Sequence, residues 1–121
     1  MKYDNNNIFA KILRGEIPCK KIFENEFVLS FYDINPQKKI HALIIPKGPY
    51  IDLDHFIKNA EEKEILEFFK AISHVAKLLK ISNIEGGYRA LSNISTNGGQ
   101  EVPHLHFHLF GGETVGKMIS N

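Results

Sequence analysis

The segment VPHLHFHLFGG, residues 102–112, carries three of the six histidines of this 121-residue chain, and one apolar residue separates each from the next. Side chains alternate between the two faces of a β-strand, so His104, His106 and His108 are expected to form a row of imidazoles, spaced about 7 Å apart, on one face. The apolar residues between them would face the core. A neutral imidazole can act as a nucleophile, transfer protons or bind a metal ion, so this row is the first candidate for a functional site.

Spacing alone leaves three interpretations of this row open. The histidines form the polar face of a half-exposed strand, or two or three of them hold zinc or iron, or one attacks an electrophile while its neighbours orient it, donate protons or bind an anion. The preceding residues 97–102, NGGQEV, include two glycines, which let backbone N–H groups converge on an anion such as phosphate. Asn-Gly-Gly is also ordinary turn chemistry, but the loop favours an anionic substrate over a metal alone.

Hydrophobic periodicity and turn signals predict the elements that must position these residues. Asn7 is expected to cap a short amphipathic helix over residues 8–13. A long helix is expected over residues 60–79, with Asn59 and Glu62 as its capping pair. Strands are expected at residues 20–24, 27–32, 40–45, 88–94 and 104–110. Strands joined by short turns on either side of one long helix favour an α+β fold with a five-stranded antiparallel sheet, one long helix and one short helix.

Length and composition limit the class of protein. A chain of 121 residues with 43% hydrophobic and 24% charged residues is expected to form a single domain over residues 1–121, with a flexible N-terminal tail at 1–6 and a C-terminal tail at 113–121. No apolar segment is long enough to span a bilayer and the N-terminus lacks a secretory signal, so a cytoplasmic location without a membrane partner is expected. A net charge of +1 with dispersed basic residues argues against a nucleic-acid partner and for a small ligand.

The segment HLHFHLF resembles the signature of the histidine triad (HIT) superfamily, and NGGQEVPHLHFHLFGG resembles its Hint-like branch in particular. Further segments are similar to those that Hint-like proteins carry in the same order: IFAKILRGEIP, FYDINPQKKIHALIIPK and GYRALSN. The resemblance covers residues 8–112. It implies a HIT-like α+β fold, a homodimer in which two sheets join, binding of a purine nucleotide such as AMP, and hydrolysis of the P–N bond of purine nucleoside 5'-monophosphoramidates.

The resemblance also implies roles for the histidines. His106, the middle one, would attack the α-phosphorus and carry a transient nucleotidyl group, which water would release as a nucleoside monophosphate. The family suggests the backbone carbonyl of His104 as the partner that holds His106 in its productive tautomer. His108 and His41 would help to place and neutralise the phosphate or stabilise the histidine network. The departing amine needs a proton, and its donor stays open.

Positions that match the family pattern are expected to bind the nucleotide. The phosphate would contact Asn93 and the backbone of Gly99, Gln100, Glu101 and Val102. The carboxylate of Asp33, with Ile34 beside it, would accept hydrogen bonds from the ribose hydroxyls. The apolar pocket for the base would consist of Ile8, Phe9, Ile12, Ile17, Phe31 and Leu43. Without the resemblance, this apolar set would be interpreted as ordinary core packing.

The chain departs from the family pattern at several positions. Asn7 and Ala10 flank Ile8 and Phe9 in the region where some members carry zinc-binding cysteines, so a structural zinc is not expected. No other cofactor is expected either. Glu101 stands where many animal members have serine and many bacterial ones glutamate, so a hydroxyl proton donor is absent there, which bears on the turnover rate. Pro103 removes one N–H but suits the first residue of a strand. The divergent tail at residues 113–121 bears on specificity for the amine.

Other functions stay open beside the phosphoramidase. A dinucleoside polyphosphate hydrolase of the same superfamily would use similar chemistry, although Gly111 and Gly112 directly after the triad favour the Hint-like branch. A nucleotide-binding regulatory module with vestigial catalysis would bind the nucleotide without turnover. A metal enzyme is disfavoured because the phosphate loop and the flanking segments would have no role in it.

Overall fold

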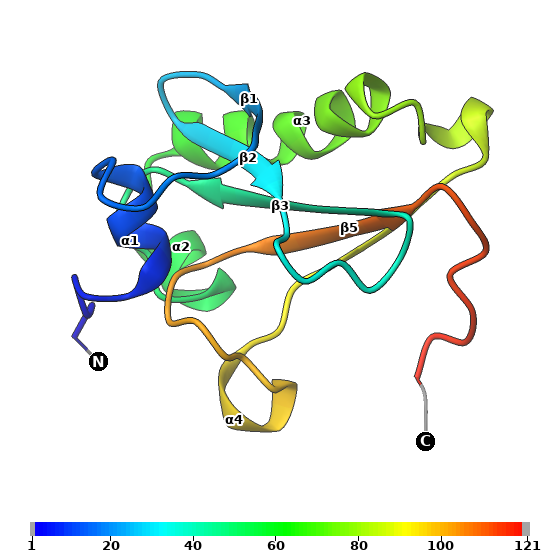
Figure 1. Cartoon of the computed structure of the whole chain (residues 1–121). Coiled ribbons are helices and arrows are strands. Elements are labelled where there is room, and N and C mark those ends of the chain that lie inside the picture. Colours follow the sequence, from blue (N-terminus) through cyan, green and yellow to red (C-terminus); the bar gives the residue numbers. More distant parts are fainter. Residues whose placement is uncertain (1, 120–121) are drawn as a thin grey trace.

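The computed structural model describes residues 2–119, and within them the chain forms one five-stranded antiparallel sheet in the order β1-β2-β3-β5-β4 (Figure 1). The strands are β1 Lys21–Glu24, β2 Val28–Tyr32, β3 Ile40–Pro46, β4 Arg89–Leu91 and β5 Phe107–Gly111. The helices are α1 Ile8–Leu13, α2 Leu53–Asn59, α3 Glu62–Leu78 and α4 Ser95–Gly98, with a 3-10 turn η1 at Asn83–Glu85. The predicted α+β class, with a five-stranded antiparallel sheet, a long helix and a short helix, is confirmed.

The central strand β3 pairs with β2 on one side and with β5 on the other. In the pairing with β5, His41 lies opposite Phe110 and Leu43 lies opposite His108. Because alternate residues of a strand share a face, this register makes His41 and His108 diagonal neighbours on one face. The sheet therefore brings together two imidazoles that are 67 positions apart in the chain.

The two faces of the sheet bury different clusters of apolar residues. On the face that α3 covers (Figure 1), the buried cluster is Val28, Ala42, Ile44, Phe56, Phe68, Ala71, Ile72, Val75, Leu105 and Leu109. On the opposite face, Phe9 of α1 packs with Leu29, Phe31, Leu43 and Ile45. Leu105 and Leu109 thus face α3, so the histidines that alternate with them face the side of α1.

Local sequence signals explain the position of α1. The Oδ1 atom of Asn7 accepts the N–H of Ala10 at 2.9 Å, which satisfies one of the free donors of the first turn. At the other end, Gly15 adopts a φ of +79° and its N–H donates to Ile12 O at 3.0 Å. The helix predicted over residues 8–13 is confirmed.

The long helix begins later than predicted because an unpredicted helix precedes it. The seven residues of α2 are too few to show a periodic apolar stripe, and the side chain of Asp52 caps its first turn. Asn59 is the last residue of α2, so it cannot cap α3, and Glu61 and Glu64 form the capping box instead. None of the described helices is long and apolar enough to cross a membrane.

The strand β5 begins three residues later than predicted, at Phe107. The backbone before it makes its hydrogen bonds elsewhere: Leu105 N–H donates to Tyr50 O at 2.8 Å, and the Ser92 hydroxyl donates to His106 O at 2.7 Å. The strand β4 is likewise shorter than predicted, and the helical turn α4 follows it. Of the three clustered histidines, only the last lies on β5 itself.

Candidate active site

His106 is 6% exposed and is held at one ring nitrogen. Its Nδ1 lies 2.7 Å from the backbone carbonyl oxygen of His104. A carbonyl only accepts hydrogen bonds, so Nδ1 carries the proton and Nε2 keeps a lone pair. Burial lowers the pKa of His106, so the neutral ring persists to a lower pH than a free imidazole would. The edge-to-face ring of Phe9, 5.0 Å away between centroids, further restricts its orientation.

His104 is 1% exposed and is held at both ring nitrogens. Its Nε2 lies 2.9 Å from Pro46 O, and its Nδ1 lies 2.5 Å from the hydroxyl oxygen of Tyr3. Because the Pro46 carbonyl must accept, Nε2 carries the proton and Nδ1 accepts from Tyr3. Burial lowers the pKa of His104 to about 4, so the ring is neutral near pH 7. His104 is therefore too buried to face a ligand, and its contact with the site is the backbone carbonyl that accepts the Nδ1–H of His106.

His41 and His108 form a directed pair. The N–H of Gln37 donates to His41 Nδ1 at 3.1 Å, so the proton of the neutral His41 ring lies on Nε2. That Nε2 is 2.9 Å from His108 Nδ1, which must then accept and leave the His108 proton on its own Nε2. Burial lowers the pKa of His41 and lowers that of His108 to about 4. His108 therefore offers an N–H donor where His106 offers a lone pair.

Asp33 stands beside this pair, with its Oδ2 3.4 Å from His41 Nε2. One ligand atom from each of Asp33, His41 and His108 lies within 4.8 Å of the others, a donor set that zinc or ferrous iron accepts. However, His41 Nε2 and His108 Nδ1 already share a hydrogen bond, so an ion would have to displace its proton. The expectation that the protein uses no metal stays a prediction.

The loop before the histidines offers fewer backbone donors than predicted. The N–H groups of Gly99 and Gln100 donate to carbonyl oxygens of α4 at 3.1 and 3.0 Å, so they are engaged within the turn. Among residues 2–119, the N–H groups of Glu101 and Val102 have no acceptor. On this loop, the backbone N–H groups that can donate to a phosphate are therefore those of Glu101 and Val102.

The side chain of Gln100 holds this loop in place. Its Oε1 accepts the N–H of Ser95 at 3.1 Å, and its Nε2 donates to Ile51 O at 2.7 Å and to Val102 O at 3.0 Å. These bonds tie both ends of the loop to the segment before α2. Gln100 thus supports the loop through its side chain, which the sequence did not indicate.

Two cavities meet at Asp33. The smaller, of about 160 Å³, is lined by Phe9, Asp33, Gln37, Leu43, Asn93, Gly99, Glu101, Val102, His106 and His108. The larger, of about 740 Å³, is lined by Pro18, Cys19, Lys20, Tyr32, Asp33, Ile34, Pro36, Lys39 and His41. The smaller cavity combines a nucleophilic lone pair, imidazole and backbone donors and a carboxylate, which together suit chemistry on an anionic group.

Apart from Phe9 and Leu43, the apolar residues predicted to bind the nucleotide do not line the smaller cavity. Phe31 is buried in the cluster beneath α1, and Ile12 packs against that cluster. Ile8 is 41% exposed, and Ile17 lines neither of the two cavities. Ile34 is 83% exposed at the rim of the larger cavity. Of the set predicted for the base, only Phe9 and Leu43 reach the smaller cavity.

The residues that hydrogen-bond to the histidines include several that were not predicted as site residues, among them Gln37, Ser92 and Tyr3. Gln37 and Ser92 lie in the segments FYDINPQKKIHALIIPK and GYRALSN, so the resemblance pointed to their neighbourhood but not to their contacts. Tyr3 lies outside residues 8–112 and in the predicted N-terminal tail. No pattern in the sequence links it to His104, which is 101 positions away.

The chain is similar to known proteins over nearly its whole length. The profile of the HIT domain matches residues 14–115. A HIT-like protein of Azospirillum brasilense is 53% identical over 118 residues, which cover 98% of this chain and 95% of that one. The purine nucleoside phosphoramidase of Escherichia coli K12 is 38% identical over 115 residues, covering 94% and 93%. Among solved structures, a HIT family hydrolase from Legionella pneumophila has a TM-score of 0.83 at 35% identity, covering 92% and 96%.

Proposed function

The chain belongs to the HIT domain family, and from this membership and the geometry of His106 we propose that it hydrolyses the P–N bond of purine nucleoside 5'-monophosphoramidates. The observation that carries the proposal is the single hydrogen bond from His106 Nδ1–H to the carbonyl of His104, which leaves Nε2 as a nucleophile at the smaller cavity. The name of the Escherichia coli relative, a purine nucleoside phosphoramidase, supports the choice of reaction.

The reaction proceeds in two displacements at the α-phosphorus. In the first, His106 Nε2 forms a bond to phosphorus while the P–N bond to the amine breaks and its electron pair goes to the amine nitrogen, which takes up a proton. In the second, water attacks the phosphorus and the bond to His106 breaks, releasing the nucleoside monophosphate. The nucleotidylated ring is positively charged, and the His104 carbonyl that accepts its Nδ1–H stabilises this charge.

His108 and His41 support the phosphoryl group rather than attack it. The direction of the hydrogen bonds from Gln37 through His41 to His108 leaves an N–H on His108 Nε2. Because His108 lines the smaller cavity with His106, this N–H serves as a donor to the phosphoryl oxygens, on which negative charge increases in the transition state. A donor that is fixed before the substrate arrives needs no reorganisation during the reaction.

The phosphoryl group occupies the smaller cavity and the nucleoside extends beyond it. A volume of about 160 Å³ suits a phosphoryl group but not a whole nucleotide. The N–H groups of Glu101 and Val102 and the side chain of Asn93 then contact the phosphate, and Asp33, which lines both cavities, contacts the ribose. The contacts to the base stay part of the proposal: Ile8, Phe9, Ile12, Ile17, Phe31 and Leu43. Ile34, beside Asp33, stays a proposed nucleotide-binding residue.

Release of AMP from an adenosine 5'-phosphoramidate by the purified protein tests the proposal. We expect turnover that resists EDTA and is lost in His106→Ala, while AMP binding is retained. His74→Ala is the matched control, because it removes an exposed imidazole that packs on Phe23 away from the site. Full activity of His106→Ala would refute the nucleophile, and loss of wild-type turnover in EDTA would indicate a metal at Asp33, His41 and His108.

A second function is favoured by Glu101, which lines the same cavity as the proposed phosphate and whose negative charge acts on His106. A negative charge at this place repels the negative charge that develops on the phosphoryl group. The alternative is a nucleotide-binding regulatory module with vestigial catalysis, which would bind AMP without hydrolysing the phosphoramidate. Including a dinucleoside polyphosphate in the same assay separates the third candidate, a hydrolase of that substrate class.

We also propose that the protein is a cytoplasmic homodimer with neither nucleic-acid nor membrane partners. The strand β4 lies at the edge of the sheet, so one side of its backbone is available to pair with β4 of a second copy. Light scattering after size-exclusion chromatography measures the mass of the particle in solution. A particle of one chain at micromolar concentration would contradict the dimer.

A further inference from the structure

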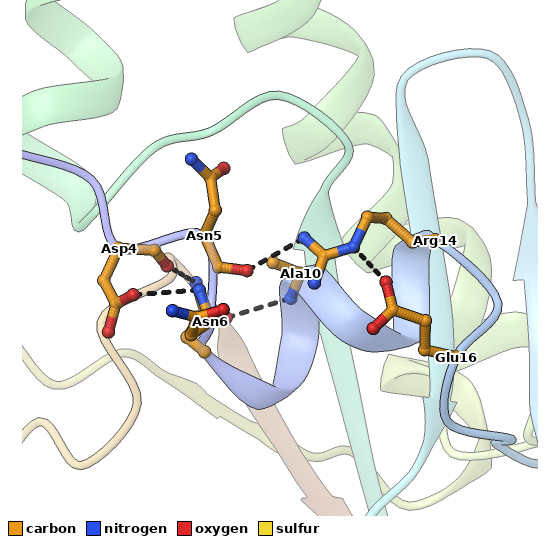
Figure 2. Close-up of polar contacts among 7 residues, drawn as sticks. Asp4, Asn5, Asn6, Ala10, Arg14 and Glu16 are labelled. Carbon is orange, nitrogen blue, oxygen red and sulfur yellow. Dashed lines mark hydrogen bonds and ion pairs between the residues drawn. The ribbon is translucent and has the colours of Figure 1, made fainter.

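The residues before α1 fold back along the helix and are held there by polar contacts (Figure 2). The carbonyl of Asp4 accepts hydrogen bonds from Asn7 N and Asn7 Nδ2 at 3.3 and 2.7 Å. Nη1 of Arg14 donates to Asn5 O at 2.8 Å, and Arg14 is itself paired with Glu16, as Figure 2 shows. These contacts join residues 4–7 to both ends of α1. They therefore fix the direction in which the chain runs from Asp4 to Tyr3.

That residue, Tyr3, reaches the imidazole behind the proposed nucleophile. Its hydroxyl oxygen lies 2.5 Å from His104 Nδ1, and the two rings meet edge to face with their centroids 5.6 Å apart. His104 Nε2–H donates to Pro46 O, so Nδ1 of the neutral ring can only accept and the hydroxyl of Tyr3 is the donor. The ring is thereby held from opposite ends, by the last residue of β3 and by the N-terminal segment.

His104 connects Tyr3 to His106 through its own backbone. The carbonyl of His104 accepts the Nδ1–H of His106, and the direction of that carbonyl depends on backbone dihedrals that the anchored side chain restrains. In addition, the hydroxyl occupies the lone pair on which His104 would be protonated. A proton there would place a positive charge beside His106 and reduce its nucleophilicity.

We propose that Tyr3 is a positioning residue for the reaction: its hydroxyl keeps the His104 ring neutral and in one orientation, so that the His104 carbonyl holds His106 in the tautomer whose Nε2 attacks. The inference rests on the proposed function of His106. Tyr3 lines neither cavity at Asp33, so it acts through His104 and not on the substrate. It also lies outside residues 14–115, so the HIT profile does not include it.

The variant Tyr3→Phe keeps the ring and removes only the hydroxyl. With an adenosine 5'-phosphoramidate as substrate, we expect kcat to fall about tenfold, with KM and the Kd for AMP unchanged within about twofold, because the tautomer matters for attack and not for binding. Tyr88→Phe is the matched control, since Tyr88 packs partly buried on the α3 face, away from the histidines. It is expected to leave kcat unchanged. A kcat for Tyr3→Phe equal to that of the wild type would overturn the proposal.

Nitrogen-15 NMR of the histidine side chains gives a readout that does not depend on turnover. We expect His104 of the wild type to titrate near its lowered pKa of about 4 and the Tyr3→Phe variant to titrate at higher pH, because the lone pair is no longer occupied. A purely structural role would lower the melting temperature without moving this titration, and that result would also overturn the proposal. If the His104 titration moves in Tyr3→Phe but the wild-type protein shows no turnover, the result would instead refute the proposed function and leave the contact between Tyr3 and His104 established.

Discussion

Replacement of Gln100 tests how the loop before the histidines presents its N–H groups. The Gln100 side chain makes three hydrogen bonds, and Gln100→Ala removes all of them together. A net value of about 1 kcal/mol for each bond, reduced because the side chain is only partly buried, predicts a loss of about 2 kcal/mol. Much of this loss is expected as local opening of the loop, since its remaining contacts lie at the surface.

Local opening weakens the phosphate site because it disperses the N–H groups of Glu101 and Val102. A loss of about 2 kcal/mol corresponds to about a 30-fold weaker Kd for AMP if all of it appears in binding, and we expect a decrease of between about 5-fold and 30-fold by calorimetry. Asn59→Ala is the control, because it also removes an amide, with one hydrogen bond to His55 O on α2, away from the loop. Its AMP affinity is expected to equal that of the wild type.

The isosteric variant Gln100→Glu separates the hydrogen bonds from the shape of the side chain. A carboxylate cannot donate, so at pH 7 it would face the carbonyl oxygens of Ile51 and Val102 that the amide now binds. This repulsion raises the pKa of the introduced carboxyl in the folded state. Stability is therefore present below the unfolded pKa and lost as pH rises through the folded one, so urea unfolding should show a smaller defect at pH 4.5 than at pH 7. If Gln100→Glu binds AMP with wild-type affinity at pH 7, the Gln100 hydrogen bonds do not hold the phosphate-binding loop in place and the reasoning is refuted.

Two further predictions concern the nucleophile and the glycine turn. An imidazole with an ordinary pKa of about 6.5 is only about a tenth neutral at pH 5.5. Burial lowers the pKa of His106, so activity is lost only as the pH falls through that lowered value. We therefore expect kcat/KM at pH 5.5 to stay well above a tenth of its value at pH 7.5. A fall to a tenth or below would contradict the effect of burial. Gly99 has a φ of +76°, so Gly99→Ala should cost about 1 kcal/mol of stability and weaken AMP binding, whereas Gly15→Ala, at a φ of +79°, should carry the same strain without affecting AMP. Equal AMP affinities of these two variants, measured by calorimetry, would exclude a role of the turn in binding.

The fold could be predicted from the sequence where local signals are strong. The apolar residues that alternate with the histidines are buried on the face of α3, as the period of two requires, because burial stabilises Leu105 and Leu109 far more than it would an imidazole. The cap at Asn7 likewise marks α1. By contrast, the seven-residue helix α2 is too short for a periodic pattern, and its presence moved the start of α3.

The candidate site could be predicted only in part. The motif NGGQEV identified a loop that reaches the smaller cavity through Gly99, Glu101 and Val102. The contacts of Gln100 did not follow from the motif, because its side chain turns back to Ile51 O, 49 positions earlier in the chain. Short motifs indicate which backbone forms a turn, but the partner of a side chain depends on which distant segment packs beside it.

The alternation of histidines and apolar residues is enough to predict that several imidazoles share one face of a segment, with core residues on the other. The position of the proton on each ring follows from the folded structure alone. The proton of His104 lies on Nε2 because the carbonyl of Pro46 lies there, and that of His108 lies on Nε2 because His41 donates to its other nitrogen. A tautomer depends on the group within hydrogen-bond reach of each nitrogen, and these groups arrive through the pairing of β3 with β5 and the return of the N-terminal segment. The three histidines of the row thereby differ in their proposed roles: His104 positions His106, His106 is the nucleophile and His108 is a hydrogen-bond donor.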